Sequence, residues 1–403
     1  MFKCFALFAL VLFIPLLLGS ETQERGGAEL VFGMSTVLSD PAQTLGLDMR
    51  KGVLSGFERI NRAGGINGRR LRLIALDDGY EPSRTAPNMR QLVEQQHVLG
   101  IIGNVGTPTA IVSLPIVKEN KTVFFAGYTG AGVLRKEPPD RYVINYRASY
   151  AEEAGAMIDA LLGDLKLQPE DIALFTQRDS YGDAGYNGSI AALKRHGLKD
   201  DRSILHVRYE RNTLAVENAV ADVVLSARPV RAVVMVGAYA PSAKFIQLCC
   251  QADLHPIFLN VSFVGSKPLA KELLQTDATV IVTQVVPHPL DETLPIVREY
   301  LADLKTFEPG SAPSFGDLEG YIASRILTLA LERVKGEPTR ESIVDALEGL
   351  GEFQLGLGAG LRLNSREHQA SLSVWPTILK SGSFVPLAWK DLLKSDKRSA
   401  SRE

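Results

Sequence analysis

The chain alternates short runs of apolar, β-type residues with longer amphipathic helical patterns over most of its length. Strands that are each followed by a helix pair in parallel and carry helices on both faces of the sheet, so this alternation predicts an α/β fold. The strands that we expect are residues 30–34, 71–76, 98–102, 123–126, 172–176, 203–209, 232–236, 257–260 and 280–285. The helices that we expect between them include residues 46–63, 84–96, 151–165, 184–196, 214–226 and 241–252.

This number of strands exceeds what one sheet holds comfortably, and 403 residues exceed one ordinary domain. We therefore expect two doubly wound parallel-sheet lobes. Residues 28–146 with 286–355 are predicted to form the first lobe, and residues 147–285 with 356–390 the second. Because such a chain crosses between the lobes several times, we expect a multi-strand hinge with a cleft beside it.

Beyond Pro287 the pattern changes to consecutive helices. These helices are expected at residues 295–307, 315–334 and 340–350, where they would complete the first lobe. Extended runs at 373–379 and 384–387 flank residues 380–383 (KSGS), which indicates a β-hairpin. Residues 391–403 are mostly polar and are expected to form a flexible tail.

The N-terminus has the pattern of a secretory signal peptide, with Lys3, an apolar run at residues 5–18 and small residues at the exit. We expect residues 1–20 to be cleaved after Ser20, which would export the mature protein to the periplasm. An uncleaved membrane anchor is the alternative, although the apolar run is short for a membrane span.

Composition and missing motifs argue against several function classes. The net charge is −2 and no basic stripe occurs, so we expect no nucleic-acid partner. The chain lacks a phosphate-binding loop and a Gly-x-Ser-x-Gly nucleophile elbow, and its six histidines form no His-x-x-x-His pair. We therefore weigh an enzyme as the weaker alternative and expect no cofactor, no metal and no catalytic residue.

Two cysteines, Cys249 and Cys250, remain after removal of the signal peptide. A disulfide between adjacent cysteines is strained, so we expect two buried thiols on a helix.

Residues 98–130 carry the strongest indication of a binding site. Two predicted strands end there in glycine-rich tips, residues 103–108 (GNVGTP) and 127–130 (GYTG). Ligands of parallel α/β sheets bind beyond the carboxyl ends of the strands, where glycine allows close approach and threonine supplies hydrogen bonds. Thr107 followed by Pro108 is interpreted as a helix N-cap and first helical residue, whose free N–H groups would attract a carboxylate. Two ordinary βα turns are the alternative interpretation.

The residues 63–70 (AGGINGRR), followed by 71–78 (LRLIALDD), resemble a hallmark of type I periplasmic binding proteins. The resemblance is to the branch that includes the leucine/isoleucine/valine-binding receptors of ABC transporters, and it extends from about residue 29 to 390. Further markers are residues 179–182 (DSYG), 237–239 (GAY) and 318–321 (LEGY). The resemblance implies two lobes that close over a small ligand.

In that family a hydroxyl after the third strand holds the ligand's carboxylate, a role that the resemblance assigns to Thr107. The backbone and a hydroxyl after the fourth strand assist, which assigns Gly127 and Thr129. Leu45, after the first strand, would contact the ligand. Tyr128 either points into the cleft, where it would favour a flat ligand, or packs at the rim.

On the second lobe the resemblance places Tyr181 and Tyr239 over the ligand; a packed rim position is the alternative for each. Amino-acid binders carry a carboxylate there for the ligand's ammonium group, and the matching position is Ser262. Because a buried ammonium group without an anionic partner is costly, either another acid such as Glu319 or Asp179 takes this role or the ligand lacks an amine.

The resemblance implies a monomer that captures an amino acid or an organic or aromatic acid and delivers it to the permeases of an ABC importer. Presentation of the ligand to a membrane histidine kinase or chemoreceptor is the alternative, because both roles need only the surface of the closed lobes. We expect a hinge motion in which ligand binding shifts the population towards the closed form.

Overall fold

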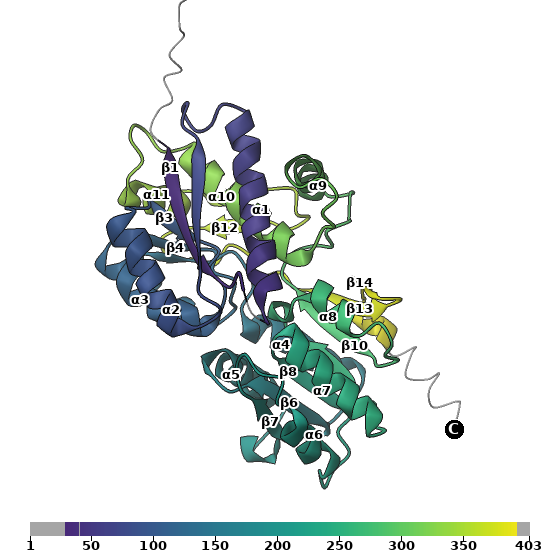
Figure 1. The fold of residues 1–403 in the computed structure, drawn as a ribbon. Helices are drawn as coiled ribbons and strands as arrows, with labels where there is room; N and C mark the ends of the chain where they lie inside the picture. Colours follow the sequence, from purple (N-terminus) through teal and green to yellow (C-terminus); the bar gives the residue numbers. More distant parts are fainter. Residues whose placement is uncertain (1–28, 40, 393–403) are drawn as a thin grey trace, which may run out of the picture.

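The structure, a computed structural model, describes residues 29–39 and 41–392. The expected signal peptide and all but the first two residues of the expected tail lie outside these ranges. Two mainly parallel sheets with helices on both faces make up the described chain (Figure 1). The predicted α/β class with two doubly wound sheets is therefore confirmed.

The first sheet is five-stranded and parallel, with the order β2-β1-β3-β4-β5. Its strands are β1 (Leu30–Thr36), β2 (Leu71–Asp77), β3 (Gly100–Ile102), β4 (Val123–Phe125) and β5 (Val143–Ile144). The helices that connect these strands are α1 (Gln43–Arg62), α2 (Pro82–Arg90) and α3 (Thr107–Glu119).

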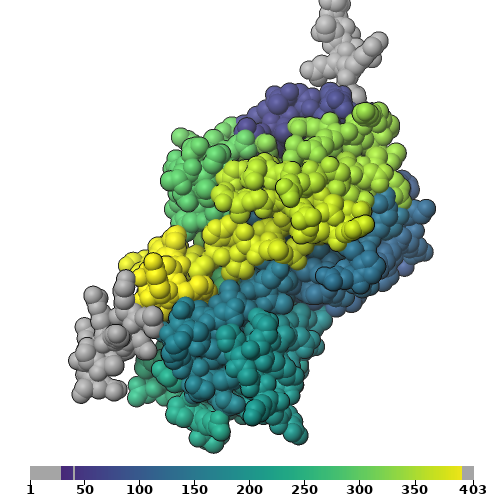
Figure 2. Space-filling view, turned by 180° about the vertical axis from the view of Figure 1, so that it is seen from behind, coloured from purple at the N-terminus to yellow at the C-terminus, as the bar shows by residue number. Residues whose placement is uncertain are grey.

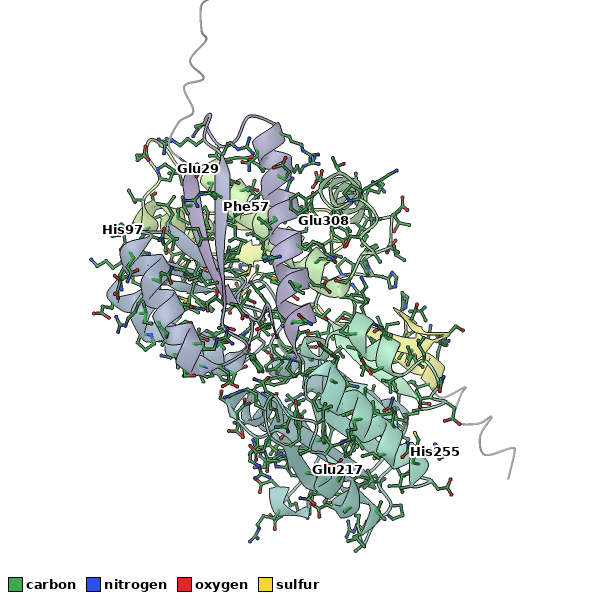
Figure 3. The ribbon with its side chains drawn as sticks, viewed as in Figure 1. Glu29, Phe57, His97, Glu217, His255 and Glu308 are labelled. Carbon is green, nitrogen blue, oxygen red and sulfur yellow. The ribbon has the colours of Figure 1, made fainter. Side chains whose placement is uncertain are left out.

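The apolar residues Leu45, Met49, Val53 and Phe57 recur every four positions and give α1 one buried face. Phe57, labelled in Figure 3, packs on Phe32 of β1 with ring centroids 5.8 Å apart. This face fixes α1 against the sheet and thereby places the loop after β1.

The late helices α9 (Pro295–Phe307), α10 (Phe315–Leu331) and α11 (Arg340–Glu348) pack beside α1 and the first sheet (Figure 1). Glycine permits the closest part of this contact, because a Cβ atom on Gly52 would lie 1.9 Å from the carbonyl oxygen of Asp317. The C-terminal third of the chain thus supports the lobe that the N-terminus begins.

The second sheet has the order β14-β13-β10-β9-β8-β6-β7, in which β13 and β14 are antiparallel. Its strands are β6 (Ile172–Gln177), β7 (His206–Tyr209), β8 (Ala232–Val236), β9 (Ile257–Asn260), β10 (Val280–Gln284), β13 (Trp375–Lys380) and β14 (Ser383–Pro386). Its helices are α4 (Tyr150–Asp159), α5 (Ser180–Arg195), α6 (Glu217–Val224), α7 (Tyr239–Gln251) and α8 (Ser266–Glu272). The predicted hairpin is present as β13–β14, with Ser381 and Gly382 at positive φ in its turn.

The chain passes between the two sheets after β5, after β10 and before β13. A small hairpin, β11 (Gly351–Phe353) with β12 (Leu361–Leu363), precedes the last passage. Asn145 then pairs with Gln369, which brings this segment beside the end of β5, and Figure 2 shows residues 351–392, in yellow, along one face. The division into lobes by residue number stays a prediction.

Several elements depart from the prediction. β5, α8, β11 and β12 were not predicted, because they are short and lack a clear period. Cys249 is buried as expected, but Cys250 is only partly buried because it lies in the last turn of α7. Among the described residues, no helix combines the length and hydropathy needed to cross a membrane.

Candidate ligand-binding site

The two glycine-rich tips lie side by side at the carboxyl ends of β3 and β4. The N–H of Tyr128 donates to the Asn104 carbonyl at 2.8 Å, and the N–H of Gly106 donates to the Tyr128 carbonyl at 3.2 Å. This pairing places the hydroxyl oxygens of Thr107 and Thr129 2.7 Å apart, both buried. The structure thus brings together the hydroxyls that the sequence singled out.

Thr107 is not the N-cap of α3, and that prediction was wrong. Gly106 occupies the cap position, and Thr107 is the first helical residue, followed by Pro108. The backbone at Gly106 has φ 107°, and a Cβ atom there would lie 2.2 Å from the Tyr80 ring, so glycine is required. The helix therefore starts one residue earlier, and the Thr107 hydroxyl faces Thr129 instead of capping the helix.

Gly127 is also constrained by its surroundings. Its carbonyl accepts the N–H of Thr129 at 2.7 Å, and a Cβ atom at Gly127 would lie 2.6 Å from the Phe124 ring. The residue therefore shapes the tight turn that presents Thr129.

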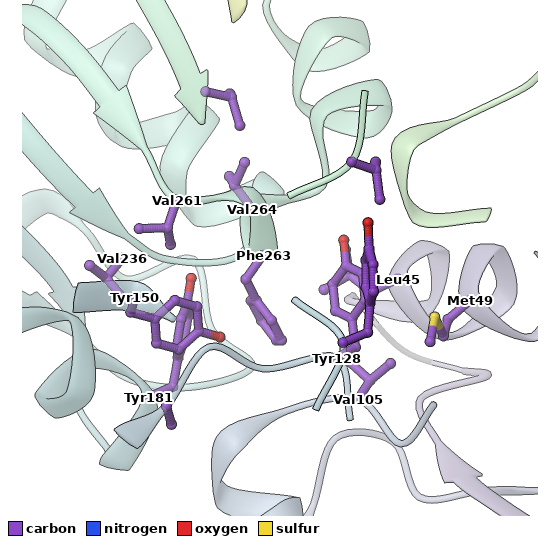
Figure 4. Close-up of a cluster of buried hydrophobic side chains, with 14 of the residues drawn as sticks. Leu45, Met49, Val105, Tyr128, Tyr150, Tyr181, Val236, Val261, Phe263 and Val264 are labelled. Atoms are coloured by element: carbon purple, nitrogen blue, oxygen red, sulfur yellow. The ribbon is translucent and has the colours of Figure 1, made fainter. Parts of the chain in front are cut away.

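Aromatic rings fill the centre of the interface between the lobes (Figure 4). Phe263, fully buried, lies 4.4 Å from Tyr181, 5.7 Å from Tyr128 and 5.9 Å from Tyr80 between ring centroids. Tyr181 is fully buried and also packs on Tyr150, at 5.3 Å. Phe263 was not predicted as a site residue, although it follows Ser262 directly.

Leu45 and Tyr239 approach each other from opposite lobes at Gly265. A Cβ atom on Gly265 would lie 2.7 Å from the Leu45 side chain and 3.5 Å from the Tyr239 ring. Leu45 also lines, with Tyr128 and Ser262, a narrow crevice of about 10 Å³. These three predicted residues therefore line one crevice.

A buried charge cluster lies around Arg147, in the passage between β5 and α4. The Nε atom of Arg147 is 3.3 Å from Glu319 Oε1, and its guanidinium lies 4.5 Å from the centre of the Tyr128 ring. Arg147 Nη2 donates to the Ser262 hydroxyl. Glu153 accepts the N–H of Ser262 at 2.7 Å and its hydroxyl at 3.0 Å. Ser262 thus lies between a buried cation and a buried carboxylate.

Burial decides the protonation of this cluster. Loss of solvent raises the pKa of Glu319 to about 7, although Arg147 lowers it, and burial likewise raises the pKa of Glu153. Burial opposes the charge of Arg147, but Glu319 and its other neighbours hold the pKa of Arg147 above its usual value. Arg147 stays charged at neutral pH while Glu319 is partly protonated.

Three buried donor atoms of the cluster lack hydrogen-bond partners. Arg147 Nη1 and Nε and the Tyr150 hydroxyl make no hydrogen bond to any residue that the structure describes, although Nε is in ion-pair contact with Glu319. Burial raises the pKa of the Tyr150 hydroxyl to about 12, although the nearby Arg147 and Thr129 lower it. The hydroxyls of Thr129 and Tyr150 do not have the geometry of a hydrogen bond. Unpaired buried donors are costly, and a bound acceptor would satisfy them.

A cavity of about 530 Å³ opens between the lobes, and Tyr150 is one of the residues that line it. Thr107 and Arg135 line it from the first lobe, and Tyr150 and Ser180 from the second. Arg135 is held by carbonyl oxygens, donating to Thr129 at 3.3 Å and to two others. Burial lowers the pKa of Arg135 to about 10, which still leaves a cation at neutral pH.

Asp179, considered as a partner for an ammonium group, is instead used to build the second lobe. Its side chain accepts the N–H of Tyr181 at 2.9 Å and caps α5. It also accepts from Gln177 at 2.7 Å and from Arg211 at 3.2 Å. The carboxylate therefore has local partners on both oxygens.

The lobes are joined by polar contacts across the cleft. Arg211 Nη2 is 2.9 Å from Glu81 Oε2, and Asn212 donates to Glu81 Oε1 at 2.7 Å. Lys267 donates to the Ala312 carbonyl at 2.8 Å. The structure therefore describes the lobes in contact.

Arg147, Phe263, Glu153, Arg135 and Tyr150 were not predicted as site residues. The sequence marks only the segment between β5 and α4, which contains Arg147 and in which Ser149 and Glu152 form the capping box of α4. Because arginine is seldom buried, the sequence favoured an exposed position for Arg147.

The model of the family described as "Periplasmic binding protein" matches residues 29–383. The chain belongs to the periplasmic binding protein family. It is therefore a solute-binding protein of the ABC-transporter type, not an enzyme, and the resemblance seen in the sequence is confirmed.

Individual relatives agree with the family. The chain is 23% identical over 366 residues to Leu/Ile/Val-binding protein homolog 7 of Brucella abortus (strain 2308), covering 86% of this chain and 88% of that one. A solved structure of a possible leucine/isoleucine/valine-binding protein from Rhodopirellula baltica SH 1 is 47% identical, with a TM-score of 0.88, and the match covers 93% of this chain and 100% of that one.

A more distant structure shows the same fold. The solute-binding protein of an ABC transporter from R. palustris, solved in complex with benzoate, is 15% identical to this chain, with a TM-score of 0.77. The match covers 89% of this chain and 96% of that one.

Proposed function

We propose that this periplasmic binding protein is exported and captures a small carboxylate without a free amine, which it delivers to an ABC importer. The observation that carries the proposal is the Arg147–Ser262 contact. In amino-acid binders the position matching Ser262 is a carboxylate for the ligand's ammonium group; here it is a serine bonded to a buried cation. This position therefore offers no negative charge of its own to an ammonium group.

The acids nearby do not replace the missing partner. Glu153 is occupied by Ser262 and by the Thr283 hydroxyl at 2.7 Å. Glu319 is beside Arg147, and its raised pKa reduces its negative charge at neutral pH. An ammonium group placed here would meet a guanidinium group without a free carboxylate, which is unfavourable.

The same cluster suits an anion. Thr107, Tyr150 and Arg135 line the cavity, and the Thr129 hydroxyl contacts that of Thr107. The buried Arg147 interacts electrostatically with Tyr150. Hydroxyl donors backed by buried cations form strong, charge-assisted contacts to carboxylates. We place the ligand's carboxylate at these hydroxyls.

The rest of the ligand would lie against apolar and aromatic surface. Gly130, Ala131 and Ala184 line the cavity together with the Tyr150 ring. Its volume of about 530 Å³ accommodates a small organic acid. The benzoate complex of the R. palustris protein supports the proposal only in that a related fold encloses an aromatic carboxylate.

The test is binding of matched ligand pairs that differ by the amine alone. Purified mature protein is titrated by calorimetry with phenylalanine against phenylpropanoate, and with leucine against its deaminated analogue. We expect the amine-free member of a pair to bind at least about tenfold more tightly, a difference near 1.4 kcal/mol. Tighter binding of the amino acids, or no binding in either series, contradicts the proposal.

The carboxylate itself is tested with benzoate against benzamide, which have similar shape but differ in charge. We expect the benzoate to raise the melting temperature more than the benzamide. An equal shift for both would exclude an anion site at the hydroxyls.

A further inference from the structure

A second group of ligand-type side chains lies at the far end of the second lobe. Cys250 lies in the last turn of α7, His255 follows in the loop before β9, and Asp277 lies in the loop before β10. Because β9 and β10 are parallel neighbours, their amino ends meet at one edge of the sheet. The topology therefore brings Asp277 to Cys250 and His255, which are close to each other in sequence, and Figure 3 shows His255 beside the end of α7.

The three side chains are close enough to share one ion. One possible ligand atom from each of Cys250, His255 and Asp277 lies within 4.8 Å of the others. Tetrahedral zinc, with bonds of about 2.0–2.3 Å, needs its ligand atoms roughly 3.5 Å apart. His255 and Asp277 are exposed, so rotation of these two side chains can close the difference while Cys250 stays fixed in the helix.

The local charges favour a cation. Asp253 Oδ1 lies 3.5 Å from His255 Nε2, which adds a second carboxylate at the edge of the cluster. The Cys250 thiol makes a long polar contact, 3.9 Å to the Thr276 hydroxyl. A divalent ion would neutralise the negative charges of Asp253 and Asp277.

We propose that Cys250, His255 and Asp277 bind one Zn²⁺ ion, with water in the fourth position. Thiolate, imidazole and carboxylate are all zinc ligands, and this mixed set selects zinc over calcium or magnesium, which prefer oxygen alone. Binding replaces the S–H bond of Cys250 with an S–Zn bond and releases the proton to solvent.

The proposed ion would stabilise the second lobe without contacting the solute. Ligands of the cleft bind at the carboxyl ends of the strands, whereas this cluster lies at their amino ends. The ion would tie the loop after α7 to the loop after α8. Zinc binding and solute binding are therefore independent properties, and failure of one leaves the other standing.

The test is metal binding by the mature protein and by three single variants. Cys250→Ser, His255→Ala and Asp277→Asn each remove one ligand, and His196→Ala, an exposed histidine on the same lobe, is the matched control. After dialysis against zinc, we expect one ion per native or control chain and at least about tenfold weaker binding in each of the three variants.

Substitution of cobalt for zinc tests independently whether the Cys250 thiolate binds the metal. We expect a sulfur-to-cobalt charge-transfer band in native protein that is absent in Cys250→Ser. Each variant's melting temperature without metal shows whether it is folded. No zinc bound to native protein, or zinc binding that survives in the folded variants as in the control, would overturn the proposal.

Discussion

The hydroxyl oxygens of Thr107 and Thr129 lie 2.7 Å apart, although the residues belong to two successive βα tips. Each hydroxyl therefore satisfies the other within the described chain. A carboxylate that binds here must break this contact and accept hydrogen bonds from the two hydroxyls in its place. Both hydroxyls therefore affect the affinity, but neither lacks a partner when the ligand is absent.

We expect Thr107→Val to weaken carboxylate binding by about 1–3 kcal/mol, because valine keeps the shape but removes a buried donor. Calorimetry with the tightest carboxylate of the screen measures the change. Thr306→Val, which removes an exposed hydroxyl from α9, is the control and should bind as native protein does. Native affinity in Thr107→Val would remove this hydroxyl from the site.

Arg147→Met is expected to lower the free energy of unfolding by about 3–5 kcal/mol, because Glu319 and Glu153 lose the cation buried beside them. Adding Glu319→Gln removes one of these uncompensated acids and should restore part of the stability. Urea unfolding followed by circular dichroism measures both variants.

The same double variant separates stability from binding. It should fold but bind the carboxylate at least about tenfold more weakly than native protein, since the buried cation is gone. Glu319→Gln alone is the matched control and keeps Arg147. If the double variant bound with native affinity, Arg147 would have no part in attracting the anion.

The regular elements followed from the sequence where the hydrophobic pattern was strong. β8, β9 and α9 have the predicted bounds, because their apolar runs end abruptly at glycine, proline or polar residues. β5 has two residues, too few for a periodic pattern, yet it leads into the passage that holds Arg147.

The site followed from the sequence only in part. Glycine and threonine at the ends of β3 and β4 marked the tips, because strand ends of a parallel sheet converge. The position of Phe263 between three tyrosines depends on how the two lobes pack, and so does the burial of Arg147. Tertiary packing of this kind leaves no local pattern.

Stability should depend on pH through Glu319. Its folded pKa of about 7 lies above the ordinary 4.5, so the folded state holds more protons than the unfolded state between these values. The contribution of Glu319 to the free energy of unfolding should therefore fall as pH rises from 4.5 to 7, by up to about 3 kcal/mol, and level off above. Urea unfolding across this range measures the slope.

Glu319→Gln is the control for this slope, because glutamine does not titrate. The raised pKa values of Glu153 and Asp78 give slopes of the same sign, whereas burial lowers the pKa of His206 to about 4 and gives a slope of opposite sign in this range. The measured quantity is therefore the difference in slope between native protein and the variant. Equal slopes in native protein and the variant would show that burial does not raise the pKa of Glu319.

Arg211→Ala is expected to weaken closure of the lobes. The variant loses the 2.9 Å contact to Glu81 across the cleft, while Asn212 keeps its own bond to Glu81. Partly exposed ion pairs contribute about 0.2–1 kcal/mol, so we expect affinity to fall by up to roughly fivefold, mainly through faster dissociation. Arg202→Ala, which breaks an exposed pair with Asp200 inside one lobe, is the matched control. Small-angle scattering should show a larger radius of gyration for Arg211→Ala than for native protein without ligand. If both the scattering and the dissociation rate were unchanged, the Arg211–Glu81 pair would not hold the lobes together.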